Sequence, residues 1–182
     1  FGMSEHHMRL GGTITLDFET MYAVIRCVVR SLREHGFRRI FILNGHGGNN
    51  ELIQLVARDL ALAHSAHLAA ASYWTIAWEA LRRLEAHGGR FPGHAGAFET
   101  SLMLALRPDL VCASLPHRED PPSHEVRLPA SYRLERHGAW QAIDGYTDSP
   151  DRAGSAQGQA FLAAISEAVS EALLEFHAKT RD

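Results

Sequence analysis

The stretch "FRRIFILNGHGGNNELIQLVARDLALA", residues 37–63, carries the strongest fold signal in the chain. Residues 37–43 form a β-branched and aromatic run, which is typical of a buried strand. From Leu52 to Leu60 apolar residues recur at helical spacing, with Asn49 or Asn50 in position to cap that helix. The glycine-rich "NGHGGNN" between them therefore predicts a turn from the carboxyl end of a strand into a helix.

The neighbouring segments extend this pattern into an α/β fold. Residues 17–35 repeat apolar side chains every three or four positions, and Gly36 follows them, which predicts an amphipathic helix with a glycine stop. Residues 67–76 are short and apolar and predict the next parallel strand, so that residues 37–76 make one βαβ unit. Further helices are expected over residues 95–106 and 155–177.

Composition limits the class of protein. The chain has 182 residues, 46% of them hydrophobic and 21% charged, with a net charge of -3, which predicts one globular domain and argues against disorder. The arginines are spread along the chain, so no nucleic-acid partner is expected. The chain has no apolar run of roughly 18 residues, so no membrane span is expected.

Two further features concern the cellular setting and the loops. Cys27 and Cys112 lack Cys-x-x-Cys spacing, and we expect them to be buried thiols in a reducing cytoplasm. Residues 113–152 hold five of the seven prolines and many polar residues. They predict a long irregular excursion with a short hairpin.

The chain has 12 histidines, and four of them, His6, His7, His46 and His94, lie close to glycines. For His46 three interpretations remain open. Glycines before a helix can aim backbone N–H groups at a phosphate, although the P-loop Lys-Ser/Thr is absent. The segment can also be a plain turn. The third interpretation is a ligand site, because α/β proteins bind ligands outside the carboxyl ends of parallel strands.

A second candidate segment is "GHAGAFETSLMLAL", residues 93–106. A helix over residues 95–106 places Glu99 on one face with Leu102, Met103 and Leu106. A carboxylate on an apolar face must be paired, protonated or metal-bound, because an unpaired buried charge is costly. Glu99 and His46 together favour a divalent ion such as Zn²⁺ or Mn²⁺, with a salt bridge from Glu99 to an arginine as the alternative.

The residues of three segments resemble the creatininase (creatinine amidohydrolase) family. "GMSEHHMRLGGTITL", "FILNGHGGNN" and "HAGAFETSLMLALRPDLV" stand in the order of the family's G-x-S-x-E-H-x-x-x-x-G-T, N-G-H-G-G-N and H-A-G-x-x-E-T-S segments. The resemblance covers nearly the whole chain. It implies a three-layer α/β/α sandwich with a mostly parallel sheet, homo-oligomers that are often hexamers, and metal-dependent hydrolysis of cyclic or formyl amides.

The same resemblance implies roles for particular residues. It makes His46 and Glu99 ligands of a divalent metal, Zn or Mn, in a centre that is dinuclear in the family. It makes His94 the catalytic group that moves a proton to the leaving nitrogen. The small-molecule amide substrate is expected to contact His7, Gly47, Gly48 and Trp74.

The chain departs from the family pattern in its first segment and in what precedes it. His6 stands where the family has Glu, so that His7 matches the family His, and Gly11 replaces a Pro. No segment matches the family's E-x-H-G-x-H-L-P-L-x-T-D, which supplies a Glu, a His and a bridging Asp. We therefore expect an N-terminally truncated chain, with a catalytically inactive creatininase-like binding or scaffold protein as the alternative function.

Overall fold

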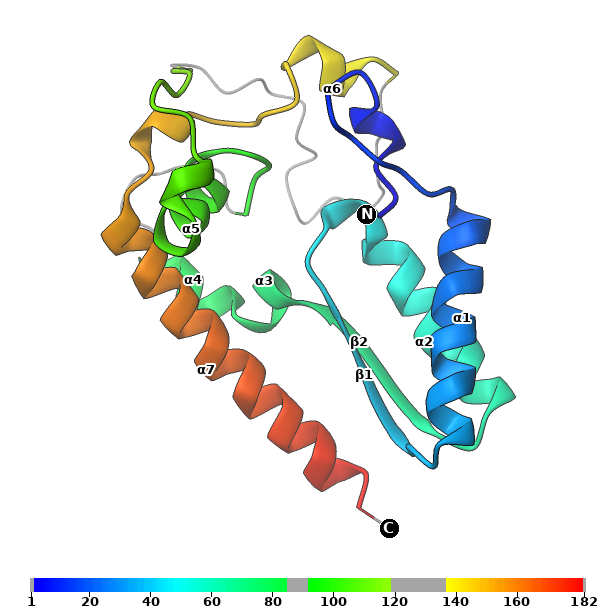
Figure 1. Ribbon diagram of the computed structural model, residues 1–182. Coiled ribbons are helices and arrows are strands. Elements are labelled where there is room, and N and C mark those ends of the chain that lie inside the picture. Colours follow the sequence, from blue (N-terminus) through cyan, green and yellow to red (C-terminus); the bar gives the residue numbers. More distant parts are fainter. Residues whose placement is uncertain (1, 85–91, 119–136, 182) are drawn as a thin grey trace. The chain divides into compact units, whose positions relative to one another are not determined.

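The structure is a computed structural model of the chain, and it describes residues 2–84, 92–118 and 137–181 (Figure 1). The chain divides into two compact units. The first, which we call the sheet unit, comprises Phe1–Trp78 and Ile165–Asp182. The second, the helical unit, comprises Glu79–Ala164. The expectation of a single domain stays a prediction.

Helices and strands alternate along the sheet unit, as the sequence predicts. Helix α1 spans Phe18–Glu34 and is capped by Asp17, whose carboxylate accepts the backbone N–H of Thr20 at 2.8 Å. It stops before Gly36, which adopts the left-handed φ of 88° that a glycine tolerates. The elements around it are η1 Glu5–His7, β1 Arg39–Asn44, η2 Gly47–Asn49, α2 Asn50–Ala63, β2 His67–Ser72 and α3 Tyr73–Ile76.

Strands β1 and β2 lie parallel, with α2 as the connection between them. Their register runs from Arg39 opposite His67 to Asn44 opposite Ser72. The sequence predicts that the second strand reaches residue 76, and this is wrong. Strand β2 ends at Ser72 because its partner β1 turns into a loop after Asn44, and residues 73–76 form the helical turn α3.

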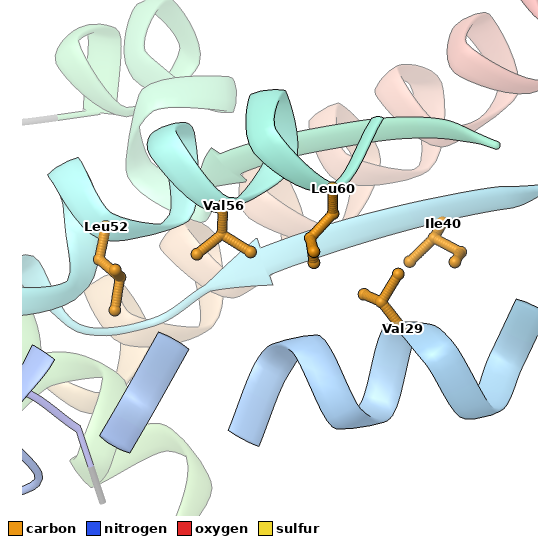
Figure 2. Close-up of a cluster of buried hydrophobic side chains, with 5 residues drawn as sticks. All are labelled: Val29, Ile40, Leu52, Val56 and Leu60. Atoms are coloured by element: carbon orange, nitrogen blue, oxygen red, sulfur yellow. The ribbon is translucent and has the colours of Figure 1, made fainter. Parts of the chain in front are cut away.

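Alternate residues of β1 face opposite sides of the sheet. Ile40 packs on the α1 and α2 side, in a buried cluster shown in Figure 2: Val29, Ile40, Leu52, Val56 and Leu60. On the other side, the ring of Phe41 meets Phe176 of α7 (Ser155–Lys179) with 5.6 Å between ring centroids. The sheet therefore carries helices on both faces, and the α/β class with a parallel sheet is confirmed.

The helical unit is built around the pairing of α5 with the first turns of α7. Helix α5 spans Ala97–Leu106, and the other elements are α4 Trp78–Leu84, η3 Pro108–Leu110, α6 Ala139–Ala142 and η4 Pro150–Arg152. Phe98 and Phe161 are both buried, with their ring centroids 4.9 Å apart. Gly158 allows this close approach, because a Cβ on it would overlap the carbonyl oxygen of Ser101.

Two expectations about the surface and loops have different outcomes. Cys27 and Cys112 are exposed, so the expectation of buried thiols is wrong. Cys27 lies two residues before the core residue Val29, and helical geometry turns it away from the sheet. The short hairpin was expected within residues 113–152, and residues 119–136 of that range lie outside the described residues. Among the helices that are described, none has the length and apolar character required to span a membrane.

Candidate active site

The loop after β1 is framed by the side chain of Asn44, which is 5% exposed. Its Oδ1 accepts the backbone N–H of His46 at 3.1 Å and an Nδ2 hydrogen of Asn49 at 3.3 Å. Its Nδ2 donates to the carbonyl of His46 and to Oγ of Ser72, each at 2.8 Å. One amide therefore fixes both backbone groups of His46 and ties the loop to the end of β2.

The asparagines after the glycines also tie segments together. Asn49 occupies the N-cap position of α2, but its side chain makes no capping hydrogen bond. Its Oδ1 instead accepts the backbone N–H of Met3 at 2.9 Å. Oδ1 of Asn50 accepts from Oγ of Ser72 at 3.0 Å. The expectation of an asparagine at the N-cap position is therefore confirmed at Asn49, although its side chain binds Met3 and not the first turn of α2.

The His46 ring is held by the N-terminal segment. Its Nε2 lies 3.1 Å from the carbonyl oxygen of Met3 and 3.0 Å from Oγ of Ser4. Two further imidazoles stand beside it, with ring centroids 6.0 Å away for His6 and 6.2 Å away for His7. The centroids of His6 and His7 are themselves 3.9 Å apart. The N-terminal segment and the loop after β1 thus meet around one histidine.

The two central glycines of the loop have different surroundings. A Cβ on Gly48 would overlap the carbonyl oxygen of Met3 and would lie 2.7 Å from Nε2 of His46. A Cβ on Gly47 would meet nothing within 4 Å. The substrate contact expected of both glycines requires open space beside their backbone. At Gly48 the space is instead filled by this chain's own Met3 and His46.

The predicted substrate contacts of the sheet unit occupy different elements. His7 is buried at the end of η1, and its carbonyl accepts a hydrogen bond from Oγ1 of Thr13 at 3.0 Å. Trp74 lies in α3, half-buried, and its ring meets Tyr73 with centroids 5.0 Å apart. The substrate roles of His7, Trp74 and the loop glycines stay predictions.

In the helical unit, His94 and Glu99 lie next to each other at the start of α5. Nδ1 of His94 is 3.8 Å from Oε2 of Glu99, and that oxygen accepts the backbone N–H of Ala95 at 2.5 Å. The ring of His94 meets Trp140 edge-on, with centroids 5.4 Å apart. The structure thus brings together the predicted proton donor and a predicted metal ligand.

The burial of Glu99 differs from the expectation. The buried face of α5 carries Phe98 and Ser101, whereas Met103 and Leu106, on the face of Glu99, are exposed. The Glu99 side chain is 35% exposed. Because α5 packs through Phe98, its neighbour Glu99 points about 100° away around the helix. The argument that Glu99 must be compensated within an apolar face is therefore wrong, and its metal role rests on the resemblance.

Sequence reasoning missed the two residues that hold the segment before α5. Thr147 donates its backbone N–H to the carbonyl of His94 at 3.0 Å, and its Oγ1 accepts the N–H of His94 at 2.8 Å. Asp148, 6% exposed, accepts the N–H of Ala97 through Oδ2 at 3.2 Å, and a Cβ on Gly96 would overlap its carboxylate. Both residues belong to the irregular excursion, where no periodic signal marks a buried side chain.

His46 and Glu99 carry the chemical groups that a divalent ion such as Zn²⁺ binds. Zn²⁺ accepts imidazole nitrogen and carboxylate oxygen, which His46 and Glu99 offer. His46 belongs to the sheet unit and Glu99 to the helical unit. Within residues 2–84, 92–118 and 137–181, no three His, Cys, Asp or Glu side chains are grouped so that they could hold a metal ion. The metal roles of both residues stay predictions.

Comparison with known proteins first gives two sequence matches. The model of the creatininase family, described as creatinine amidohydrolase, matches residues 1–173. A creatinine amidohydrolase from Pseudomonas putida is 37% identical over 110 residues, which cover 55% of this chain and 42% of that protein. The matched region is therefore less than half of that relative's length.

Solved structures give the same family. A crystal structure of creatinine amidohydrolase has a TM-score of 0.71 and 31% identity, over 92% of this chain and 67% of its own. A Mn creatininase has a TM-score of 0.71 and 29% identity, over 91% and 67%. A mutant creatininase of the Zn-Zn type has a TM-score of 0.69 and 29% identity, over the same shares. With the family model matching nearly its whole length, this chain belongs to the creatininase family.

Proposed function

We propose that this chain is a metal-dependent amidohydrolase that cleaves a non-peptide C–N bond of a small cyclic or formyl amide. Membership of the creatininase family suggests amidohydrolase activity on a non-peptide amide. The observation that carries the proposal is the family match over residues 1–173, which includes the loop of His46 and the segment of His94 and Glu99. Solved relatives described with Mn and with Zn support a divalent ion.

We assign His46 and Glu99 as ligands of this ion. When bound, the ion supplies an acidified water and a Lewis acid for the amide carbonyl. His46 suits this role because Asn44 holds its backbone and the N-terminal segment holds its ring. Ligands that hydrogen bonds orient in this way need little reorganisation on metal binding.

His94 is the proposed proton donor to the leaving nitrogen. An imidazole titrates near neutrality and serves as a general acid at physiological pH. Thr147 fixes its backbone from both sides, while Glu99 and Trp140 flank its ring.

The substrate contacts and the assembly complete the proposal. Backbone N–H groups of Gly47 and Gly48 stabilise the developing oxyanion, as donors of this kind do in acyl transfer. His7 and Trp74 contact the substrate. The protein is proposed to be a cytoplasmic homo-oligomer, and a hexamer is the assembly that the family resemblance favours.

Metal content together with hydrolysis tests this proposal. Elemental analysis of the purified protein should find Zn or Mn, and a chelator should abolish hydrolysis of creatinine or of a formyl amide until metal is restored. His46→Ala should lose metal, whereas His177→Ala, an exposed histidine of α7, should retain it. Hydrolysis by protein from which metal has been removed would contradict the proposal. Metal-free, inactive protein would favour the non-catalytic binding function.

A further inference from the structure

We infer that His46 coordinates the divalent ion through Nδ1, and that the Met3 carbonyl and the Ser4 hydroxyl are the positioning groups that determine this. The inference deepens the proposed function and rests on it for the presence of the ion. The orientation of the ring rests on contacts within the sheet unit alone. The inference concerns which ring nitrogen of His46 binds the ion and which contacts determine that choice.

The first step is the tautomer of His46. A carbonyl oxygen can only accept a hydrogen bond, so the 3.1 Å contact between Nε2 and the Met3 oxygen requires a hydrogen on Nε2. The Ser4 hydroxyl, 3.0 Å from the same nitrogen, accepts equally well. In a neutral ring the lone pair then lies on Nδ1, and only an unprotonated nitrogen can bind a metal.

The opposite tautomer conflicts with the same contacts. With the hydrogen on Nδ1, Ser4 could donate to Nε2, but the Met3 oxygen would then face the Nε2 lone pair across 3.1 Å. Two acceptors in contact without a hydrogen between them repel each other, and the carbonyl would lose its hydrogen bond. Turning the ring over would place a C–H edge against both oxygens, with the same loss.

The second step is that these acceptors are themselves anchored. The N–H of Met3 donates to Oδ1 of Asn49 at 2.9 Å, and the N–H of Ser4 donates to Oγ1 of Thr15 at 2.9 Å. Asn49 is in turn held by Asn44 within the loop of His46. The Met3 oxygen therefore keeps its position relative to the ring, and Nε2 stays committed to it.

The third step is the effect on metal binding. A ligating imidazole nitrogen lies about 2.0–2.1 Å from Zn²⁺, so an ion on Nε2 would take the place of the hydrogen that points at Met3. Binding there would break both contacts of the ring with Met3 and Ser4. Binding through Nδ1 leaves both intact. They then act as the outer hydrogen-bond partners that commonly orient a metal-bound histidine.

Nitrogen NMR of the full chain tests the inference. Long-range ¹H–¹⁵N spectra separate protonated from unprotonated ring nitrogens, and His46→Gln identifies the His46 signals by their loss. Metal-depleted protein should show Nε2 protonated and Nδ1 unprotonated. Addition of Zn²⁺ should shift the Nδ1 signal and leave Nε2 protonated.

Variants of Ser4 separate positioning from general stability. Ser4→Ala should raise the Nδ1–H population of His46 and weaken Zn²⁺ binding, measured by chelator competition, about 10-fold. Ser4→Thr, which keeps the hydroxyl, should restore both. Ser31→Ala, which removes an exposed hydroxyl of α1 bonded to the Cys27 carbonyl, should change neither.

Each other result has a distinct meaning. An Nδ1–H tautomer in metal-depleted protein, or a Zn²⁺ shift at Nε2, would overturn the inference while leaving a metal role for His46 standing. If Zn²⁺ perturbs neither nitrogen, His46 is not a ligand, and the proposed function fails together with the Nδ1 assignment. An unchanged tautomer in Ser4→Ala with unchanged Zn²⁺ affinity would remove Ser4 from the positioning groups.

Discussion

Replacing Gly48 by Ala should destabilise the sheet unit, whereas the same change at its neighbour Gly47 should not. The added Cβ at Gly48 would overlap the Met3 carbonyl oxygen, lie 2.7 Å from Nε2 of His46 and lie 3.1 Å from Cε1 of His6. At Gly47 the Cβ enters open space, and neither glycine has a positive φ. The two variants therefore share their chemistry and differ in their surroundings.

The expected difference follows from two costs that only Gly48→Ala incurs. Forcing an extra carbon into a packed region costs about 1–3 kcal/mol. Displacing the Met3 carbonyl also removes its hydrogen bond with His46, worth about 0.5–1.5 kcal/mol. The gain from restricting the unfolded chain, about 0.4–1 kcal/mol, is common to both variants and cancels. The free energy of unfolding should therefore differ between them by about 1.5–4.5 kcal/mol.

Urea unfolding followed by circular dichroism gives the difference between the two variants. Amide hydrogen exchange of the β1 and α2 backbone then shows that the loss belongs to the sheet unit. Gly47→Ala should match or slightly exceed the native protein in stability. If the two variants unfold within about 0.5 kcal/mol of each other, the variation expected for ordinary surface changes, the packing of Met3 against Gly48 is refuted.

Three further predictions concern the core, a helix cap and the missed carboxylate. Leu60→Ala should lower the free energy of unfolding by about 2–5 kcal/mol, whereas Leu62→Ala, 84% exposed, should leave the urea midpoint nearly unchanged. The hydroxyl and backbone N–H of Thr20 hold the pKa of Asp17 below its usual 3.8. The stabilising effect of the ionised Asp17 carboxylate on α1 is therefore present above pH 3.8 and is lost as the pH falls below that value. Asp17→Ser should flatten this acid dependence of the helix content. Asp148→Asn replaces one carboxylate oxygen by an NH₂ donor beside the first N–H groups of α5, and it should lower the free energy of unfolding, measured by thermal unfolding, by about 1–2 kcal/mol. An unchanged melting temperature would contradict the role of Asp148 in holding the start of α5.

The sequence pattern predicted correctly those elements whose formation depends on residues within the element itself. The helix expected over residues 17–35 is α1, and the strand and helix around "NGHGGNN" are β1 and α2, because spacing of apolar residues and a glycine stop are properties of the segment itself. The core follows the same rule for Leu52, Val56 and Leu60. Periodicity therefore predicts which elements exist and which face is buried.

The predictions failed where a contact with a residue distant in the sequence determines the local structure. The end of β2 depends on where β1 stops, and nothing in residues 67–76 records that. The exposure of Glu99 depends on which face of α5 meets Phe161. Asp148 acts on Ala97 from 51 residues away in a proline-rich segment. In each case the determining contact is tertiary, so a single-sequence pattern carries no trace of it.

The residues of "NGHGGN", residues 44–49, have different roles in the structure. Asn44 and Asn49 frame the loop, and Gly48 admits the Met3 carbonyl, so these three serve the fold whether or not a metal binds. His46 alone presents a side chain with the chemistry of a ligand, and its ring is the group that the frame orients. Presence of the motif is therefore evidence for the frame first, and for metal binding only through His46. For this reason the ring nitrogens of His46, and not the integrity of the loop, are the measurement that separates an enzyme from a binding protein built on the same fold.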